Sequence, residues 1–162
     1  MIRILALAAG LSGAAGLSQF PEYSQQYIQR LSGAVDELDR VVATFDADAS
    51  GLGMTRPEAL ADLAGGGRMG EARALSMERT FARHARLSAA LTSLETSSST
   101  RKILNISAIR DREITRETLK DFRPAIPMTL EGLGFGAAGF GLGYGIFLIV
   151  TSVIGLCLRR RV

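Results

Sequence analysis

Cysteine and histidine are almost absent from this sequence, which contains one of each among 162 residues. The lone Cys157 cannot form a disulfide within the chain, and the lone His84 cannot supply a pair of histidine ligands to zinc. No G-x-S-x-G motif appears, and the glycines of "AGGGRMG" lack the Lys-Ser/Thr ending of a phosphate loop. We therefore expect no catalytic residues, no bound metal, no cofactor and no small-molecule substrate. The protein is predicted not to be an enzyme.

The middle of the chain lacks a net charge. Residues 20–123 contain 15 basic and 15 acidic residues, so the net charge of +3 comes from the two ends. The contributing residues are Arg3, Arg159, Arg160 and Arg161, less Glu131. These arginines lie just outside two apolar segments, which is the positive-inside pattern of membrane proteins. The positive charge thus gives no reason to expect a nucleic-acid partner.

Long apolar runs occur at the two ends. The first, Ile4 to Leu17, has 14 residues, which is the length of a signal-peptide core. Extended to Phe20 it reaches the lower limit for a membrane span, and we expect it to be retained as an uncleaved anchor. The second, Leu133 to Leu158, has 26 residues and can cross a bilayer with some tilt.

This layout predicts three parts. Residues 1–20 form an N-terminal transmembrane anchor, residues 21–123 form a periplasmic helical domain, and residues 124–162 form a glycine-rich transmembrane helix with a basic tail. Both termini are expected in the cytoplasm, because the arginines flank the spans on that side. The predicted fold class is an all-α membrane protein, with two transmembrane helices around a periplasmic antiparallel helical hairpin.

Glycine is concentrated where the second span begins: seven of the fifteen residues in "EGLGFGAAGFGLGYG" are glycine. Glycine disfavours a helix by about 1 kcal/mol relative to alanine. In lipid, however, small residues let helix backbones approach closely. We therefore predict a glycine-zipper packing face and leave open whether its partner is the other span, another copy or another protein. The predicted interface residues are Gly10, Gly13, Gly132, Gly136, Gly139 and Gly143.

The middle of the chain has helical periodicity and no strand pattern. We expect a long helix over Glu22–Ala47, a short one near Thr55, a flexible connection over 65–70, a second long helix over Glu71–Thr96 and further helix over 101–122. Apolar residues at heptad spacing predict a coiled-coil face on the first long helix. That face consists of Tyr27, Leu31, Leu38, Val41 and Phe45.

The two halves of the middle segment carry opposite charge. Residues 20–62 contain 3 basic and 8 acidic residues, and residues 63–123 contain 12 and 7. An antiparallel hairpin would bring Asp36 and Asp39 toward Arg79, Arg83 and Arg86. The rival explanation is that the acidic half of one copy meets the basic half of the next. His84 is expected on the helix surface.

The stretch "PEYSQQYIQRL" resembles a bacterial inner-membrane family that is catalogued as a domain of unknown function. The matching residues are Pro21, Gln26, Tyr27, Gln29, Arg30 and Leu31. The two terminal spans around a helical segment fit the same family, so the resemblance covers the whole chain in layout. It implies a bacterial inner-membrane location and no known activity.

Together these features suggest a structural protein of the inner membrane. The leading hypothesis is a scaffold that self-assembles through its small-residue spans and charge-matched periplasmic helices, in contact with membrane lipids. The alternative is an accessory subunit of a larger membrane complex, respiratory or photosynthetic.

Overall fold

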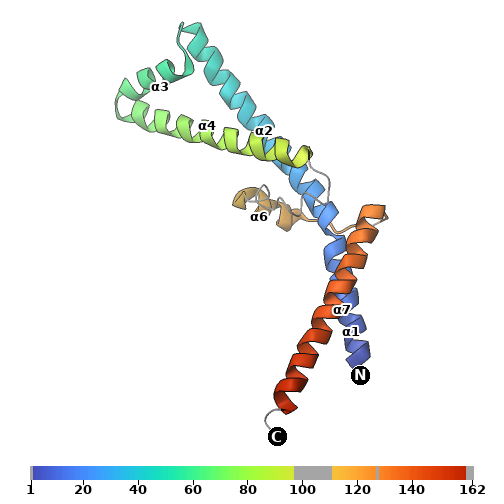
Figure 1. Ribbon diagram of the computed structural model, residues 1–162. Coiled ribbons are helices and arrows are strands. Elements are labelled where there is room, and N and C mark those ends of the chain that lie inside the picture. Colours follow the sequence, from blue (N-terminus) through green and yellow to red (C-terminus); the bar gives the residue numbers. More distant parts are fainter. Residues whose placement is uncertain (1, 97–110, 127, 160–162) are drawn as a thin grey trace. The chain divides into compact units, whose positions relative to one another are not determined.

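All elements that the computed structural model describes are helices, which confirms the all-α prediction (Figure 1). The structure describes residues 2–96, 111–126 and 128–159, the last three of these as backbone only. The helices are α1 (Ile2–Ser18), α2 (Phe20–Gly51), α3 (Arg56–Gly65), α4 (Gly67–Glu95), α6 (Arg112–Asp121) and α7 (Leu130–Arg159). Part of the helix expected over 101–122 falls on residues outside the described ranges.

The chain divides into two compact units. The terminal unit combines residues 1–26 with residues 119–162, and the central unit comprises residues 27–118. Two helical stretches, Ile2–Gly51 and Leu130–Leu156, are long and apolar enough to cross a membrane. Only 17% and 6% of their apolar windows are buried within the chain, so most of this apolar surface faces outward. Two long apolar helices with exposed surfaces are consistent with membrane association.

The terminal unit is an antiparallel pair of helices, α1 and α7 (Figure 1). The N-terminus of α7 is capped by Thr129, whose hydroxyl oxygen accepts a hydrogen bond from the Gly132 amide at 3.0 Å. Such a cap satisfies one of the free amides of the first turn. Because the pair is antiparallel, Ile2 and the Arg159 end of α7 lie at the same end of the unit.

The central unit is built around α2 and α4, which run antiparallel with α3 between them in sequence (Figure 1). Helix α2 is longer than the predicted Glu22–Ala47: it begins at Phe20, with Pro21 tolerated in its first turn, and continues to Gly51. Helix α3 begins at a capping box in which the Thr55 amide donates to the Glu58 carboxylate at 2.7 Å. This bond holds the pKa of Glu58 below its usual value.

The flexible connection predicted over 65–70 is wrong. Helix α3 ends at Gly65 and α4 starts at Gly67, so the glycines form a tight turn between two helices. Gly67 has a φ of +81°, a conformation that glycine adopts without steric cost. A Cβ on Gly70 would collide with the Leu63 carbonyl oxygen. The absence of a side chain at Gly70 therefore lets the start of α4 lie close to the end of α3.

Three large side chains in the central unit are fully buried: Tyr27, Leu31 and Leu94. Along α2 the buried face continues through Val35, Val42 and Ala49. The last three residues of the predicted coiled-coil face, Leu38, Val41 and Phe45, lie at its border and are half-buried. Beyond Leu31, the most buried stripe is therefore rotated toward the residues that flank the predicted heptad.

Candidate functional site

The helix pair α1–α7 brings the glycines of the two apolar segments together. Gly13 faces Gly139, and Gly143 faces Ala9 and Gly10 of α1. A Cβ built on Gly13 would fall far inside contact distance of the Gly139 carbonyl oxygen, and a Cβ on Gly139 would do the same to Gly13. The backbones touch directly, so neither position accepts any side chain without moving the helices apart.

The remaining predicted interface residues lie along the same contact. Gly10 is covered by the Phe140 ring, and Gly136 lies beside Ser18, whose Cβ would be 3.8 Å from a Cβ at position 136. Gly132 is buried at the start of α7. Five of the six predicted glycines, Gly10, Gly13, Gly136, Gly139 and Gly143, thus lie on the facing surfaces of α1 and α7 within one chain.

Helix α7 carries a second, separate stripe of small residues on its opposite face. Gly134, Gly141 and Gly145 have no described atom within 4 Å of a built Cβ, and Ala138 between them is exposed. These four residues are spaced by four, three and four positions, so they line one side of the helix. We call Gly134, Ala138, Gly141 and Gly145 the open stripe.

Two glutamines fix the segment that leads into α7. The Gln19 side-chain amide donates to the Ala125 carbonyl and accepts from the Ala125 amide, both at 3.1 Å. Gln26 makes the same pair of bonds with Arg123, at 3.0 and 3.2 Å. Sequence reasoning missed both glutamines in this role, because their partners are backbone groups about a hundred positions away and carry no residue pattern.

Aromatic side chains reinforce the same end of the terminal unit. The rings of Phe20 and Phe135 are 5.7 Å apart, and those of Tyr23 and Phe122 are 6.1 Å apart in an edge arrangement. Such pairs contribute roughly 0.5–1.5 kcal/mol beyond their burial. Phe20 and Tyr23 therefore pack within the chain.

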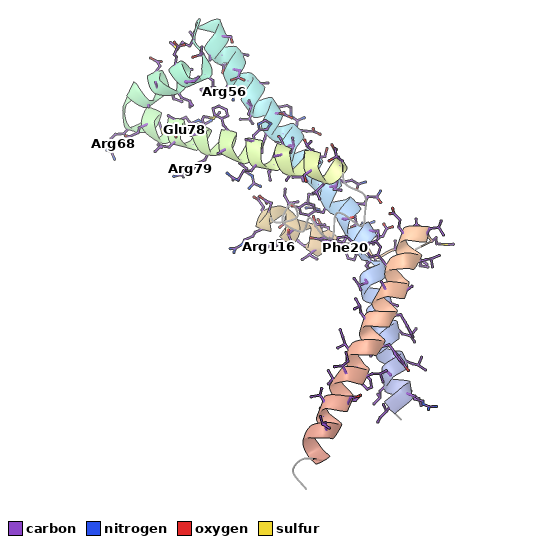
Figure 2. The ribbon with its side chains drawn as sticks, viewed as in Figure 1. Phe20, Arg56, Arg68, Glu78, Arg79 and Arg116 are labelled. Carbon is purple, nitrogen blue, oxygen red and sulfur yellow. The ribbon has the colours of Figure 1, made fainter. Side chains whose placement is uncertain are left out.

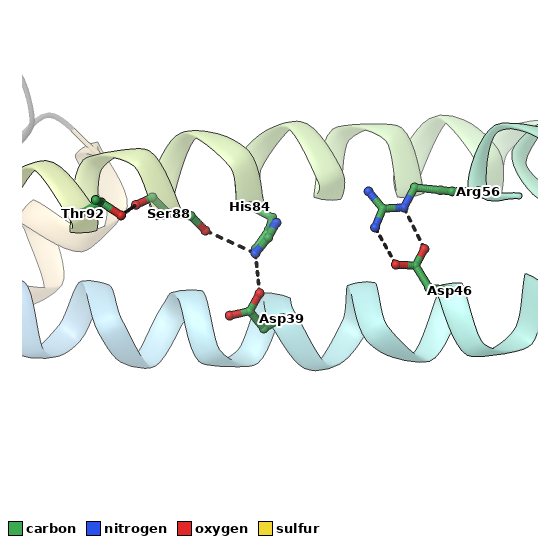
Figure 3. Close-up of polar contacts among 6 residues, drawn as sticks. All are labelled: Asp39, Asp46, Arg56, His84, Ser88 and Thr92. Carbon is green, nitrogen blue, oxygen red and sulfur yellow. Dashed lines mark hydrogen bonds and ion pairs between the residues drawn. The ribbon is translucent and has the colours of Figure 1, made fainter. Parts of the chain in front are cut away.

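His84 joins the two long helices of the central unit. Its Nε2 atom lies 2.6 Å from Asp39 Oδ1 on α2 and 3.2 Å from the Ser88 hydroxyl on α4 (Figure 3). A Ser-His-Asp triad needs the serine and the aspartate on different ring nitrogens. Here one nitrogen contacts both groups, so the cluster cannot relay a proton from serine to aspartate. Its geometry suits a structural contact between α2 and α4.

A second polar contact ties the first residue of α3 back onto α2. The Arg56 guanidinium donates to both oxygens of Asp46, at 2.8 and 2.6 Å (Figure 3). The same guanidinium lies 4.7 Å from the centre of the Phe81 ring, which itself contacts Phe45 edge-on at 5.3 Å. The hydrogen bonds from Arg56 hold the pKa of Asp46 below its usual value.

This shift gives a pH prediction. The folded-state pKa of Asp46 is depressed, so its contribution to stability is present above the unfolded value of about 3.9 and is lost as the pH falls through the folded value. We expect Asp46→Asn to lower the melting temperature at pH 7 and to have a progressively smaller effect as the pH falls below about 3.9. Asp48→Asn, on the same helix and without an ion pair among the described residues, is the matched control. Circular-dichroism melts of the full chain in detergent measure the difference, and a pH-independent effect of Asp46→Asn contradicts the assignment.

The predicted charge pairing between α2 and α4 differs from the observed contacts. Asp39 pairs with His84, and Arg83 pairs with Asp111 and Glu113 at 3.2 and 3.0 Å. Within the described ranges, Asp36, Arg79 and Arg86 form no ion pair across the two helices. Figure 2 shows Arg79 on the side of α4 that faces away from α2. Charge composition predicted that the halves attract, but helix rotation decides which side chains meet.

Among the described residues, no group of three or more His, Cys, Asp and Glu side chains is placed to hold a metal ion. The candidate site is formed by the closed α1–α7 contact and by the open stripe on the opposite face of α7.

Comparison with known proteins places the chain in a family. No curated protein and no solved structure matches it significantly. A family model described as "Protein of unknown function (DUF2937)" matches residues 1–160, nearly the whole chain. The resemblance seen in "PEYSQQYIQRL" is confirmed at the level of an uncharacterised family. The chain therefore belongs to the family described as Protein of unknown function (DUF2937).

Proposed function

We propose that this protein is a non-enzymatic scaffold of the bacterial inner membrane, in which copies associate through the open stripe of α7. Both termini lie in the cytoplasm and the middle segment, residues 21–123, lies in the periplasm. The arginines at the two ends of the sequence support this orientation, since basic residues favour the cytoplasmic side.

The open stripe is the observation that carries the proposal. The glycines that pack within the chain are Gly136, Gly139 and Gly143, and they account for one face of α7. Gly134, Gly141 and Gly145 remain on the other face with nothing against them. Within lipid a glycine gains nothing from contact with acyl chains, whereas a second helix can use it for close backbone approach. Two small-residue faces on α7 are what we expect of a helix that packs against two other helices, one on each face.

The outward side chains support a lipid environment around this pair. Leu5, Leu11, Leu142 and Ile146 are between 55% and 63% exposed. Contiguous apolar surface of this kind is unfavourable in water and marks contact with a membrane or another protein. The open stripe interrupts that apolar surface along one line of α7. In the proposed assembly, α7 of a second copy packs against this line.

Substitution of Gly141 by leucine tests the proposal. A leucine there blocks close approach of a second α7 but meets no atom of α1, so the chain should insert and fold normally. We expect the oligomeric species of the wild type to shift toward monomer, measured by native mass spectrometry in a mild detergent. Gly155→Leu, also open but outside the stripe, should keep the oligomer. A wild type that is strictly monomeric and purifies without partners overturns the scaffold proposal.

An accessory subunit of a larger membrane complex is the second candidate, and the outer face of α4 favours it. Arg79 and Arg86 are exposed on that face and pair with no acid among the described side chains, so an acidic partner could neutralise them. Affinity purification from native membranes separates the candidates. Stoichiometric recovery of other subunits supports the accessory role, and recovery of this chain alone supports self-assembly.

A further inference from the structure

A pocket of about 550 Å³ opens in the central unit between α2, α3 and α4. This volume lies within the range of roughly 300–1,000 Å³ that is typical of small-molecule sites. Its apolar wall is formed by Val41, Phe45, Leu63 and Met77, of which Met77 is buried. The ring of Phe45 is held in place by Phe81, so this wall is backed by fixed packing.

The charged residues around the pocket are of both signs, and they are not all paired. Glu37 and Arg40 form an ion pair with each other on α2. Arg73 from α4 and Asp48 from α2 also line the pocket, and neither has an ion pair within the ranges that the structure describes. Two facing helices therefore present one available cation and one available carboxylate beside an apolar wall.

We propose that this pocket binds a zwitterionic amphiphile of single-chain lipid size. Its apolar chain lies against Phe45, Leu63 and Met77, its anionic group on Arg73, and its ammonium group on Asp48. A purely anionic amphiphile would meet Asp48, and a free zwitterion without a chain would leave the apolar wall in contact with water. This inference is independent of the scaffold proposal, because none of its residues belongs to α1 or α7.

Lysophosphatidylethanolamine is the probe, because it combines one acyl chain with a phosphate and an ammonium group. Binding to the full-length protein in an uncharged maltoside detergent is followed by native mass spectrometry. We expect saturable binding of one molecule per chain. Lysophosphatidylglycerol, which lacks the ammonium group, and glycerophosphoethanolamine, which lacks the chain, should each bind at least about tenfold more weakly, a loss of roughly 1.4 kcal/mol.

Variants then locate the site. Arg73→Asp should weaken binding at least about tenfold, and Arg79→Asp, on the outer face of the same helix, should leave it unchanged. The exchange Asp48→Arg with Arg73→Asp keeps one charge of each sign and should restore binding. If the exchange variant does not fold, Met77→Trp, which fills the pocket, should abolish binding while helicity is kept. Equal binding by wild type, Arg73→Asp and Met77→Trp, or no saturable binding by the wild type, overturns the proposal.

Discussion

Gly139→Leu is expected to separate α1 from α7. A Cβ at this position would already collide with the carbonyl group of Gly13 and with the Leu17 side chain, and two of these contacts are backbone atoms that cannot turn aside. Overpacking typically costs 1–3 kcal/mol, and we expect about 3 kcal/mol here because the helices themselves must move. The gain in helix propensity, roughly 0.8 kcal/mol, does not compensate.

A disulfide can report the separation. The Cβ of Ser18 lies 3.8 Å from a Cβ built on Gly136, which is within the range that a disulfide requires. In a Cys157→Ser background, the pair Ser18→Cys and Gly136→Cys should form an intrachain cross-link, seen as a mobility shift at monomer size. Adding Gly139→Leu should largely abolish the cross-link. Adding Gly141→Leu, which has the same propensity gain on the open stripe, should leave it intact, and equal loss with both leucines contradicts the assigned packing.

Leu94→Ala is expected to cause a large loss of stability in the central unit. The Leu94 side chain is completely buried, and truncation to alanine leaves a cavity where the surroundings relax only in part. Substitutions of this kind cost about 2–5 kcal/mol. We expect a clear fall in the midpoint of urea unfolding, followed by circular dichroism of the full chain in detergent.

Leu75→Ala is the matched control for this substitution. Leu75 lies on the same helix but is 48% exposed, so its truncation removes little buried surface. Its effect should stay within about 0.5 kcal/mol. Similar losses from Leu75→Ala and Leu94→Ala would mean that the buried Leu94 side chain does not anchor α4.

The periodic features of the fold could be predicted from the sequence. The spacing of Gly136, Gly139 and Gly143 marked a close-packed helix face, and Tyr27 and Leu31 marked the buried side of α2. Both are local patterns that follow from the 3.6-residue turn of a helix. The partner of the glycine face could not be predicted. A stripe of small residues determines how closely another helix can approach, but it does not determine which helix that is.

Contacts that depend on helix rotation or on backbone groups could not be predicted either. His84 was expected on the surface, but it contacts Asp39 because α4 turns this side chain toward α2. Arg83 was expected to face α2, yet it reaches Asp111 and Glu113. A rotation of a few tens of degrees about the helix axis exchanges such partners, and charge composition does not determine that angle. The bonds of Gln19 and Gln26 leave no trace in the sequence, since any backbone amide can serve as their partner.

The pairing of α1 with α7 has a consequence for the order of events during synthesis. Gly13 leaves the ribosome long before its neighbour Gly139, and at roughly 5–20 residues per second the delay is on the order of ten seconds. Throughout that interval α1 has no α7 to pack against, while the whole central unit is made and can fold. Helix α1 is thus available to other helices or to chaperones until α7 is made, and the pair can close only after the central unit has been synthesised.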